Sequence, residues 1–402
     1  MKILMLTPYL PYPATDGGQI RSFNLIKHLS KKHEITLYSY IRFRDKNQEK
    51  DIQVLKKYCR KVEVVNRGKT WTLSNILRTG FSLYPFLISI YRSPLLREKI
   101  RKELASEQYD LIHAETFYVM PYIPKTSVPV ILVEQTINYK VFEHYVMTNK
   151  WLILKPLLWI DVQKLKFWET YYWKKAVRVT AVSDADAAVM KAHVPGLKVQ
   201  IIANAIGQDF ENLPTTTHYN HDILFMGNYK WMQNWEAAEV LIKDVFPLIK
   251  KAIPDSRLII AGQFIRKEFK GYESKDLVIN DLKPDDGPGV ARAMRTGGVL
   301  VAPIYGPGGT RLKILGAAAA MLPVVTTPTA ASGLSFRNGE SILIGKTPAD
   351  LARLTTELLR SKDAYRKIVM RAKKIVEQKY SWESVAKKLE TVYKDVLRIQ
   401  KG

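Results

Sequence analysis

Short apolar segments rich in β-branched residues recur along the chain and alternate with longer segments in which apolar residues follow helical spacing. The short segments are nearly continuous in apolarity, which is typical of strands buried on both faces of a parallel sheet. Seven such segments occupy the first half of the chain: residues 2–7, 34–40, 61–65, 109–113, 128–134, 178–183 and 199–203. The helical stretches between them, such as residues 20–29, complete an alternation that predicts a parallel α/β sheet.

The pattern restarts after residues 209–222, a polar stretch with proline and three threonines that we interpret as a linker. Six more apolar segments follow: residues 223–226, 258–261, 277–279, 298–302, 324–327 and 341–344. The sequence therefore predicts two doubly wound domains in tandem, closed by an amphipathic helix over residues 381–399. Sheets of this type bind ligands at the carboxyl ends of their strands, so the loops after predicted strands are the places to search for a site.

Composition narrows the class of protein. The 402 residues fit two or three domains, and 47% hydrophobic with 25% charged residues is the balance of an ordinary globular protein. A single cysteine, Cys59, excludes an internal disulfide and a cysteine-built zinc site, and it fits a reducing cytoplasm. No targeting segment is expected, and the apolar run at residues 80–91 is too short to span a membrane.

The net charge of +24 indicates a polyanionic partner: nucleic acid, an acidic membrane surface or a phosphorylated substrate. Residues 1–200 carry 32 basic and 17 acidic side chains, so the excess leans to the first half of the chain. Residues 151–175 also combine four tryptophans with several lysines, the composition of a membrane interface. Core-packing helices with solvated edges are the alternative for this segment and for residues 80–91.

The strongest candidate site is a glycine-rich loop that opens a helix after the strand at residues 298–302. Its backbone amides and the helix N-terminus suit a diphosphate, and cations at that end of a helix oppose its dipole unless an anion binds there. Solvated surface cations are the alternative. The loop residues of interest are Gly308, Gly309, Thr310, Arg311 and Lys313.

Three further candidate sites each follow a predicted strand. They are Gly17 with Gly18 after the first strand, Asn228 with Lys230 after the first strand of the second domain, and His113 with Glu115 at the end of segment 109–113. Each pair also has a plain structural explanation, as a turn, an exposed turn lysine or a turn cap.

These segments together resemble glycosyltransferase family 4. The resemblance is carried by residues 1–37, by residues 223–262 and by the block GGTRLKIL at residues 308–315, and it covers nearly the whole chain. It implies an α/β GT-B fold, in which two Rossmann-like doubly wound domains face a deep interdomain cleft. The expected parts are an acceptor-side domain at 1–208, a nucleotide-sugar-binding domain at 209–380 and a C-terminal helix at 381–402 that crosses back to the first domain.

The resemblance also implies roles for the candidate residues. Arg311 and Lys313 would neutralise the donor diphosphate, Lys230 would assist, and Gly18 would approach the donor phosphate from the first domain. Enzymes of this fold neutralise the leaving diphosphate with cations and helix dipoles, so neither a metal nor a cofactor is expected.

Two positions depart from the family pattern. Gly316 stands where a glutamate usually binds the ribose, and a glycine inside a helix implies that a ligand or close packing occupies the space beside it. Glu115 stands where many members have the second histidine of His-Ala-His. His113 and Glu115 are the candidate catalytic residues, with Glu115 orienting the acceptor or stabilising positive charge on the sugar.

The implied activity is that of a retaining, metal-independent hexosyltransferase. It would move a sugar from a nucleotide-diphosphate sugar to a glycan or a lipid-linked acceptor in surface polysaccharide biosynthesis. We expect a cytoplasmic protein, with a peripheral position on an anionic inner membrane face left open, and no nucleic-acid partner. The alternatives are a non-catalytic glycan-binding or scaffold protein of the same fold, favoured by Gly316, and an epimerase of nucleotide sugars.

Overall fold

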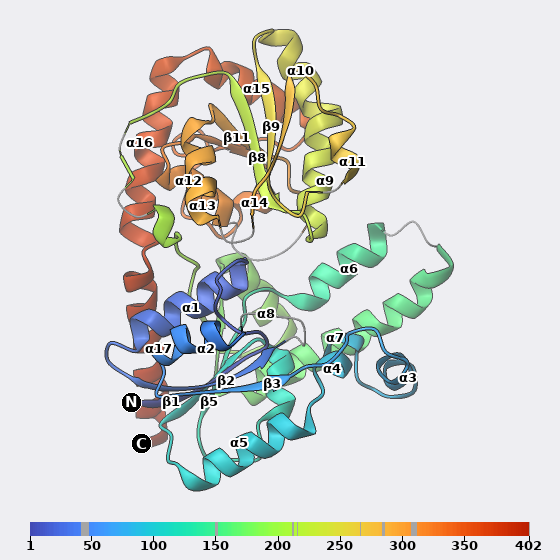
Figure 1. The fold of residues 1–402 in the computed structure, drawn as a ribbon, viewed down its shortest axis with the longest axis vertical. Coiled ribbons are helices and arrows are strands. Elements are labelled where there is room, and N and C mark those ends of the chain that lie inside the picture. The colour runs from blue at the N-terminus through green and yellow to red at the C-terminus, as the bar shows by residue number, and fades with distance from the viewer. Residues whose placement is uncertain are drawn as a thin grey trace. The chain divides into compact units, whose positions relative to one another are not determined.

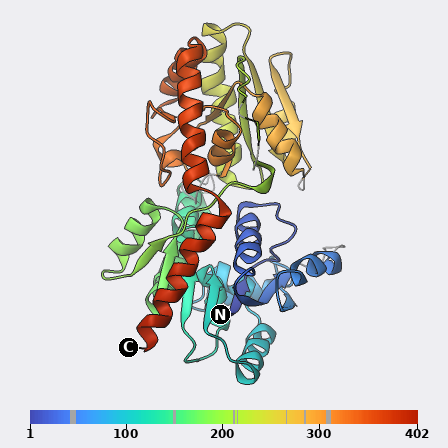
Figure 2. The same ribbon diagram turned by 90° about the vertical axis from the view of Figure 1, so that its left-hand side faces the viewer.

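The computed structural model describes residues 1–41, 48–148, 152–210, 213–214, 216–265, 267–283, 286–306 and 312–401. The chain divides into two compact units, one formed by Met1–Ala203 with Val385–Gly402 and the other by Asn204–Ser384. Each unit is a sheet with helices packed against it (Figures 1 and 2).

The sheet of unit 1 has seven parallel strands in the order β3-β2-β1-β4-β5-β6-β7. Its central strands bury both faces, as their continuous apolarity predicts. The strands are β1 (Lys2–Thr7), β2 (Glu34–Ile41), β3 (Lys61–Asn66), β4 (Leu111–Glu115), β5 (Val130–Val133), β6 (Arg178–Ala181) and β7 (Val199–Ile201).

Polar caps fix where the helices of this unit begin. Asp16 accepts a hydrogen bond from the Gln19 amide to start α1, and Ser183 accepts one from the Asp186 amide to start α8. The helices are α1 (Gly17–Leu29), α2 (Gln48–Lys56), α3 (Leu73–Phe81), α4 (Phe86–Tyr91), α5 (Pro94–Ser106), η1 (Phe117–Tyr122), α6 (Asn138–Thr148), η2 (Leu152–Leu154), α7 (Lys155–Lys175) and α8 (Asp184–His193).

Unit 2 has six parallel strands in the order β10-β9-β8-β11-β12-β13. The strands are β8 (Asp222–Asn228), β9 (Arg257–Gln263), β10 (Leu277–Asp281), β11 (Val299–Ala302), β12 (Val324–Thr326) and β13 (Leu343–Ile344). The helices are η3 (Gln208–Phe210), α9 (Met232–Val240), η4 (Leu241–Val245), α10 (Phe246–Ala252), α11 (Lys267–Lys270), α12 (Gly287–Thr296), α13 (Leu312–Ala319), α14 (Pro328–Ala331), α15 (Pro348–Leu359) and α16 (Lys362–Lys379). The last helix, α17 (Trp382–Lys401), begins in unit 2 and belongs to unit 1 from Val385 onward.

Two parallel sheets of Rossmann-like type confirm the predicted fold class, and each predicted strand has a counterpart. One boundary was wrong in a way that affects the site. The strand predicted at residues 109–113 is β4 at Leu111–Glu115, so His113 lies in mid-strand and Glu115 is the last strand residue. The acceptor and donor roles assigned to the two domains stay predictions.

Each sheet has one point where the strand order reverses. In unit 1 this switch point lies between β1 and β4, and in unit 2 it lies between β8 and β11. In sheets of this type, ligands bind at such a point, outside the carboxyl ends of the strands. Among the described residues, no helix is both long and apolar enough to cross a membrane.

Candidate functional site

A cluster of buried polar side chains lies at the switch point of the first sheet. Glu115 is fully buried, and its Oε1 atom lies 3.0 Å from Nε2 of His113. Gln135, which follows β5, donates through Nε2 to the other carboxylate oxygen. Both oxygens of Glu115 are therefore engaged inside the protein.

The charge of Glu115 is stabilised by cationic neighbours. Burial opposes its ionisation, but the hydrogen bond and charge of His113 and the charge of Arg21 outweigh burial and hold the pKa of Glu115 below its usual range. Arg21 is itself buried in α1, and its guanidinium donates to the carbonyl oxygen of Ala203 at 3.0 Å. Glu115 is thus a carboxylate that accepts hydrogen bonds and has no proton to give.

His113 joins this carboxylate to the C-terminal helix. Its Nδ1 atom pairs with the hydroxyl of Tyr393 from α17, and burial together with the charge of Glu115 raises the pKa of that hydroxyl well above its usual value. Because the ionised Glu115 can only accept, Nε2 of His113 donates to it. Since His113 is fully buried, its ring positions Glu115 from within the protein.

Two half-buried side chains extend the cluster outward. Gln135 donates through Nε2 to the Tyr9 hydroxyl at 2.7 Å, and both side chains lie against Gly18 at the start of α1. A Cβ atom at Gly18 would come within 2.8 Å of the Gln135 amide oxygen and closer still to the Tyr9 hydroxyl. The predicted residues Gly18, Glu115 and His113 therefore belong to one network, whereas Gly17 is exposed beside it. We call Tyr9, Arg21, His113, Glu115, Gln135 and Tyr393 the Glu115 cluster.

A second buried glutamate lies on the neighbouring strand and has the opposite ionisation. Glu134 follows β5 and accepts a hydrogen bond from Nε1 of Trp173 at 3.0 Å. Burial, reinforced by the negative charge of Glu169, raises the pKa of Glu134 well above its usual value and so favours its protonated form. Glu169 in turn accepts from the backbone amides of Asn138 and Tyr139 at 2.8 and 2.9 Å, which caps α6. This pair supports the fold.

At the switch point of the second sheet, Asn234 contacts both Lys313 and Asn228, two of the residues predicted to bind the sugar donor. The Nζ atom of Lys313 in α13 donates to Asn234 Oδ1 at 2.7 Å and lies 4.4 Å from the centre of the Phe225 ring. The side chain of Asn234 donates to the carbonyl of Asn228 at 2.7 Å, at the carboxyl end of β8. A cation is thus fixed beside the strand end where this type of sheet binds ligands.

Lys230 is a second cation at the same strand end. Its backbone amide donates to Asn228 Oδ1 at 3.1 Å, and its Nζ atom lies 3.5 Å from the centre of the Phe264 ring. The side chain is exposed. The remaining loop residues predicted to bind the donor, Gly308, Gly309, Thr310 and Arg311, lie outside the described residues, and their roles stay predictions.

Gly316 is accounted for by packing within unit 2. A Cβ atom there would lie 3.1 Å from Cζ of Phe210 and 3.2 Å from Sδ of Met294. Phe210 comes from η3 and Met294 from α12, so side chains of this chain fill the space beside Gly316. Of the two explanations offered by the sequence, the structure shows close packing.

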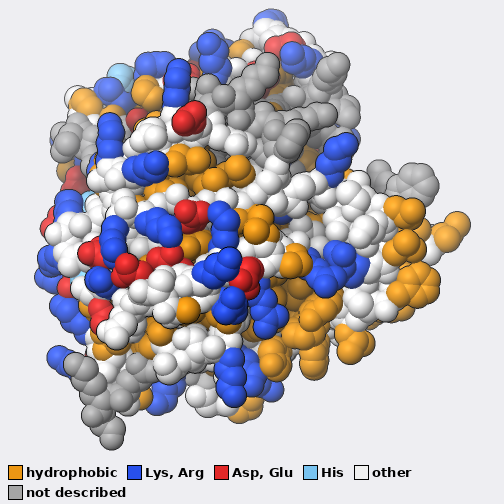
Figure 3. Space-filling model, turned by 60° about the horizontal axis from the view of Figure 1, so that its bottom comes forward, with side chains coloured by type: hydrophobic (Ala, Val, Ile, Leu, Met, Phe, Trp, Pro, Cys, Tyr) orange, Lys and Arg blue, Asp and Glu red, His pale blue; other side chains and the backbone are white. Residues whose placement is uncertain are grey.

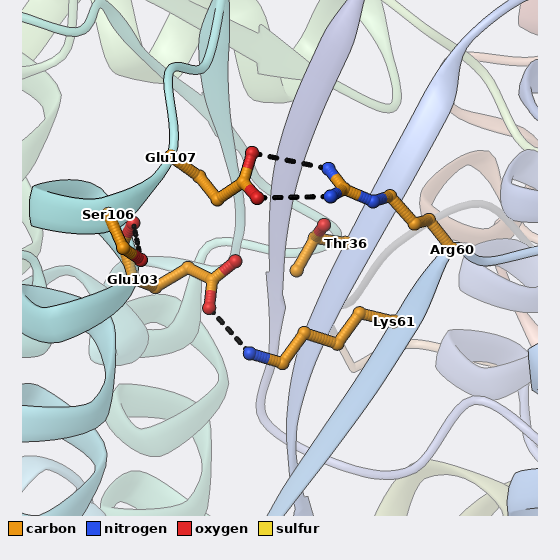
Figure 4. A pocket seen from close by; sticks show the side chains of 6 residues that line it. All are labelled: Thr36, Arg60, Lys61, Glu103, Ser106 and Glu107. Atoms are coloured by element: carbon orange, nitrogen blue, oxygen red, sulfur yellow. Dashed lines mark hydrogen bonds and ion pairs between the residues drawn. The ribbon is translucent and has the colours of Figure 1, made fainter.

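A separate pocket of about 350 Å³ lies at the opposite edge of the first sheet (Figure 4). Its charged side chains are paired with one another: Arg60 Nη2 lies 3.0 Å from Glu107 Oε1, and Lys61 Nζ lies 2.6 Å from Glu103 Oε2. Lys61 begins β3, so the pocket is at the amino edge of the sheet. These ion pairs tie α5 to the sheet and leave no cation for a ligand.

In the part of the chain that the structure describes, no group of three or more histidine, cysteine or acidic side chains is placed to hold a metal ion. Sequence reasoning missed Tyr9, Arg21, Gln135, Asn234 and Tyr393. Arg21 carried a signal, because a cation near the start of a helix opposes the helix dipole just as Lys313 does. The other four had none, since each has a partner distant in the sequence.

Two family models match the chain. The model described as Glycosyltransferase Family 4 matches residues 15–210, and the model described as Glycosyl transferases group 1 matches residues 220–361. A phosphatidyl-myo-inositol mannosyltransferase of Mycobacterium leprae is 26% identical over 312 residues, which cover 76% of this chain and 78% of the relative. An uncharacterized 44.6 kDa protein in the cps region of Klebsiella pneumoniae is 20% identical over 411 residues, which cover 96% and 97% of the two chains.

The fold is similar to solved glycosyltransferase structures. Anabaena HepE, in a crystal structure with UDP and glucose, superposes with a TM-score of 0.66 at 13% identity, and the alignment covers 98% of this chain and 100% of HepE. At that identity the similarity establishes the GT-B fold.

Proposed function

The chain belongs to the family 4 glycosyltransferases and has their GT-B fold. We therefore propose that it transfers a hexose, with retention of configuration, from a nucleoside-diphosphate sugar. The proposed acceptor is a glycan or a lipid-linked molecule of a surface polysaccharide. The observation that carries the proposal is the contact between Lys313 and Asn234 at the switch point of the second sheet. The Mycobacterium leprae relative, named for a lipid acceptor, supports a lipid-linked acceptor.

The donor site is proposed at the carboxyl ends of β8 and β11. Negative charge grows on the leaving diphosphate as its bond to the sugar breaks, and fixed cations stabilise that charge without reorganisation. Lys313 is held by Asn234, and Lys230 lies at the same strand end. The HepE structures with UDP-glucose and with UDP and glucose make uridine nucleotides the first donors to test.

We propose that the Glu115 cluster supplies the negative charge that stabilises the transferred sugar from the acceptor-side domain. The transferred sugar becomes positive as the leaving group departs, and an ionised carboxylate nearby favours that change. Glu115 is enclosed by His113 and Gln135, so it would act through its field and through the half-buried Tyr9 and Gln135. The leaving phosphate would accept the proton of the acceptor, so the proposal needs no side-chain base.

We place the enzyme at the inner face of the membrane, where a lipid-linked acceptor would be presented. The non-catalytic alternative depended on Gly316, and packing by Phe210 and Met294 gives that glycine a structural explanation. The proposal therefore needs no glutamate at this position.

Thermal unfolding in the presence of nucleotide sugars tests the donor claim. A ligand at 100 times its dissociation constant stabilises the folded protein by about 2.7 kcal/mol, which raises the midpoint of unit 2 by several degrees. The variants Lys313→Met and Lys230→Met should lose that increase. The control Lys243→Met, at an exposed lysine paired with Glu239, should keep it. A screen in which no nucleotide sugar raises the midpoint of the wild-type protein would contradict the proposal.

A further inference from the structure

Large apolar side chains are exposed on α3, on the segments flanking it, on η2 and at the start of α7. All residues of α3 are exposed or half-buried. In Figure 3, hydrophobic side chains gather on the right-hand side of unit 1, where Figure 1 places α3 and α7. Six of them are more than three-fifths exposed and define what we call the α3–α7 surface: Trp71, Leu73, Phe81, Leu83, Ile153 and Leu157.

This surface is held in place by polar contacts beneath it. The Nζ atom of Lys164 in α7 donates to the carbonyl oxygens of Thr79 and Ser82, each at 2.7 Å. Nε1 of Trp168 donates to the carbonyl of Leu83 at 2.9 Å. The end of α3 is therefore tied to α7 through backbone groups, while its apolar side chains point to solvent.

The exposed charged side chains of the same segments are basic. Residues 67–84 and 152–175 contain eight basic and two acidic side chains. Both acidic groups are used inside the protein, since Asp161 accepts from the Phe86 amide at 2.9 Å and Glu169 caps α6. Lys69, two residues from Trp71, is in contrast exposed, as are Lys174 and Lys175 at the C-terminal end of α7.

We propose that the α3–α7 surface docks the protein on an anionic lipid bilayer. Exposed tryptophan, phenylalanine and leucine with nearby lysines and no outward carboxylate match an interfacial segment, whose apolar side chains enter the headgroup region while its cations bind anionic lipids. A protein partner is less well matched, because lysine is depleted at protein interfaces. The idea that this surface brings the enzyme to a lipid-linked acceptor rests on the proposed function. Lipid binding itself does not depend on that function.

Sedimentation with lipid vesicles, without nucleotide, tests the proposal. The full chain should bind vesicles that contain phosphatidylglycerol more tightly than vesicles of phosphatidylcholine alone. The double variant Leu73→Ser, Phe81→Ser should bind at least tenfold more weakly, because each change removes a large apolar side chain from the interface. Both positions are exposed, so its urea midpoint should match that of the wild type.

Two sets of variants separate apolar insertion from charge and from general hydrophobicity. Lys174→Gln with Lys175→Gln should weaken binding to phosphatidylglycerol vesicles and leave binding to phosphatidylcholine unchanged. Leu248→Ser with Met370→Ser, at residues of unit 2 that are 46% and 52% exposed, should change neither.

Three results would overturn the proposal: no binding of the wild type to anionic vesicles, an equal loss in the unit 2 control, or a wild-type dimer that the Leu73→Ser, Phe81→Ser variant converts to a monomer. The last result would make the surface a contact between two copies of the chain. Binding of nucleoside diphosphates is measured separately, so failure of vesicle binding with intact nucleotide binding refutes the lipid surface alone.

Discussion

Two buried glutamates on neighbouring strands have opposite ionisation, which single substitutions can reveal. Glu115 at the end of β4 is surrounded by His113, Arg21 and Gln135, and its pKa is lowered. Burial and the charge of Glu169 raise the pKa of Glu134, which follows β5. Both side chains are buried, so their charged neighbours make the difference between them.

The variant Glu115→Gln should destabilise the protein at pH 7 by about 3–5 kcal/mol, because it removes the carboxylate that faces buried Arg21. A depressed folded pKa adds stability above the unfolded value of about 4.3, and that stability is lost as the pH falls through the folded value. The wild-type free energy of unfolding should therefore fall toward the variant's as the pH drops below 4.3. Urea unfolding from pH 3 to 7 measures this, and a constant difference across that range would contradict the assignment.

The variant Glu134→Gln should behave in the opposite way. A raised folded pKa means that the wild type loses stability as the pH rises above about 4.3, by up to about 1.4 kcal/mol per pH unit. Glutamine keeps an oxygen for Trp173 and does not titrate, so the variant should equal the wild type near pH 4 and exceed its stability at pH 8. A variant less stable than the wild type at pH 8 would show that Glu134 is ionised.

Gly316→Glu should destabilise unit 2 by about 1–3 kcal/mol, because the new side chain must displace Phe210 and Met294. In the Phe210→Ala background, Gly316→Glu should destabilise unit 2 less than it does in the wild type, because the smaller side chain at residue 210 leaves room for the glutamate. Chemical unfolding of the single and double variants measures the coupling. Additive effects would show that Phe210 does not limit the site.

At the scale of elements, α17 contributes to the Glu115 cluster through one side chain. Tyr393→Phe removes the hydroxyl that pairs with Nδ1 of His113 and should cost about 1–3 kcal/mol, because a buried nitrogen loses its partner. Tyr365→Phe is a matched control at a buried tyrosine whose hydroxyl lies 3.4 Å from the His218 carbonyl, and it should cost less. If both variants lost the same free energy of unfolding in urea, the contact with His113 would contribute no more than the weaker hydrogen bond of Tyr365.

The elements themselves were largely predictable, because strands buried on both faces leave continuous apolar runs in the sequence. The shift of β4 from 109–113 to Leu111–Glu115 shows where this reasoning ends. Glu115 looks like a loop residue by polarity, yet His113 and Gln135 engage both of its carboxylate oxygens inside the protein. Tyr393 is 280 residues from His113, and Asn234 is 79 residues from Lys313, so no local pattern could have paired them.

At the scale of the whole molecule, the charge of +24 has two kinds of use. Lys230 and Lys313 lie at the switch point of the second sheet, while Lys174 and Lys175 lie beside exposed apolar residues on unit 1. The first pair is proposed to meet a diphosphate and the second a lipid headgroup layer. Raising the salt concentration should therefore weaken vesicle binding and donor binding together, and the apolar part of vesicle binding should persist.

Isothermal titration of the full chain with nucleoside diphosphates is the most direct test of the central claim, that the carboxyl edge of the second sheet binds the donor. We predict that at least one of them, with UDP first, binds at one site per chain, and that Lys313→Met weakens it by about 10-fold or more, as expected for the loss of a charged contact. Lys243→Met should bind as the wild type does. If folded wild-type protein bound none of the nucleoside diphosphates, or if Lys313→Met bound as tightly as the wild type, the donor site proposed here would be wrong.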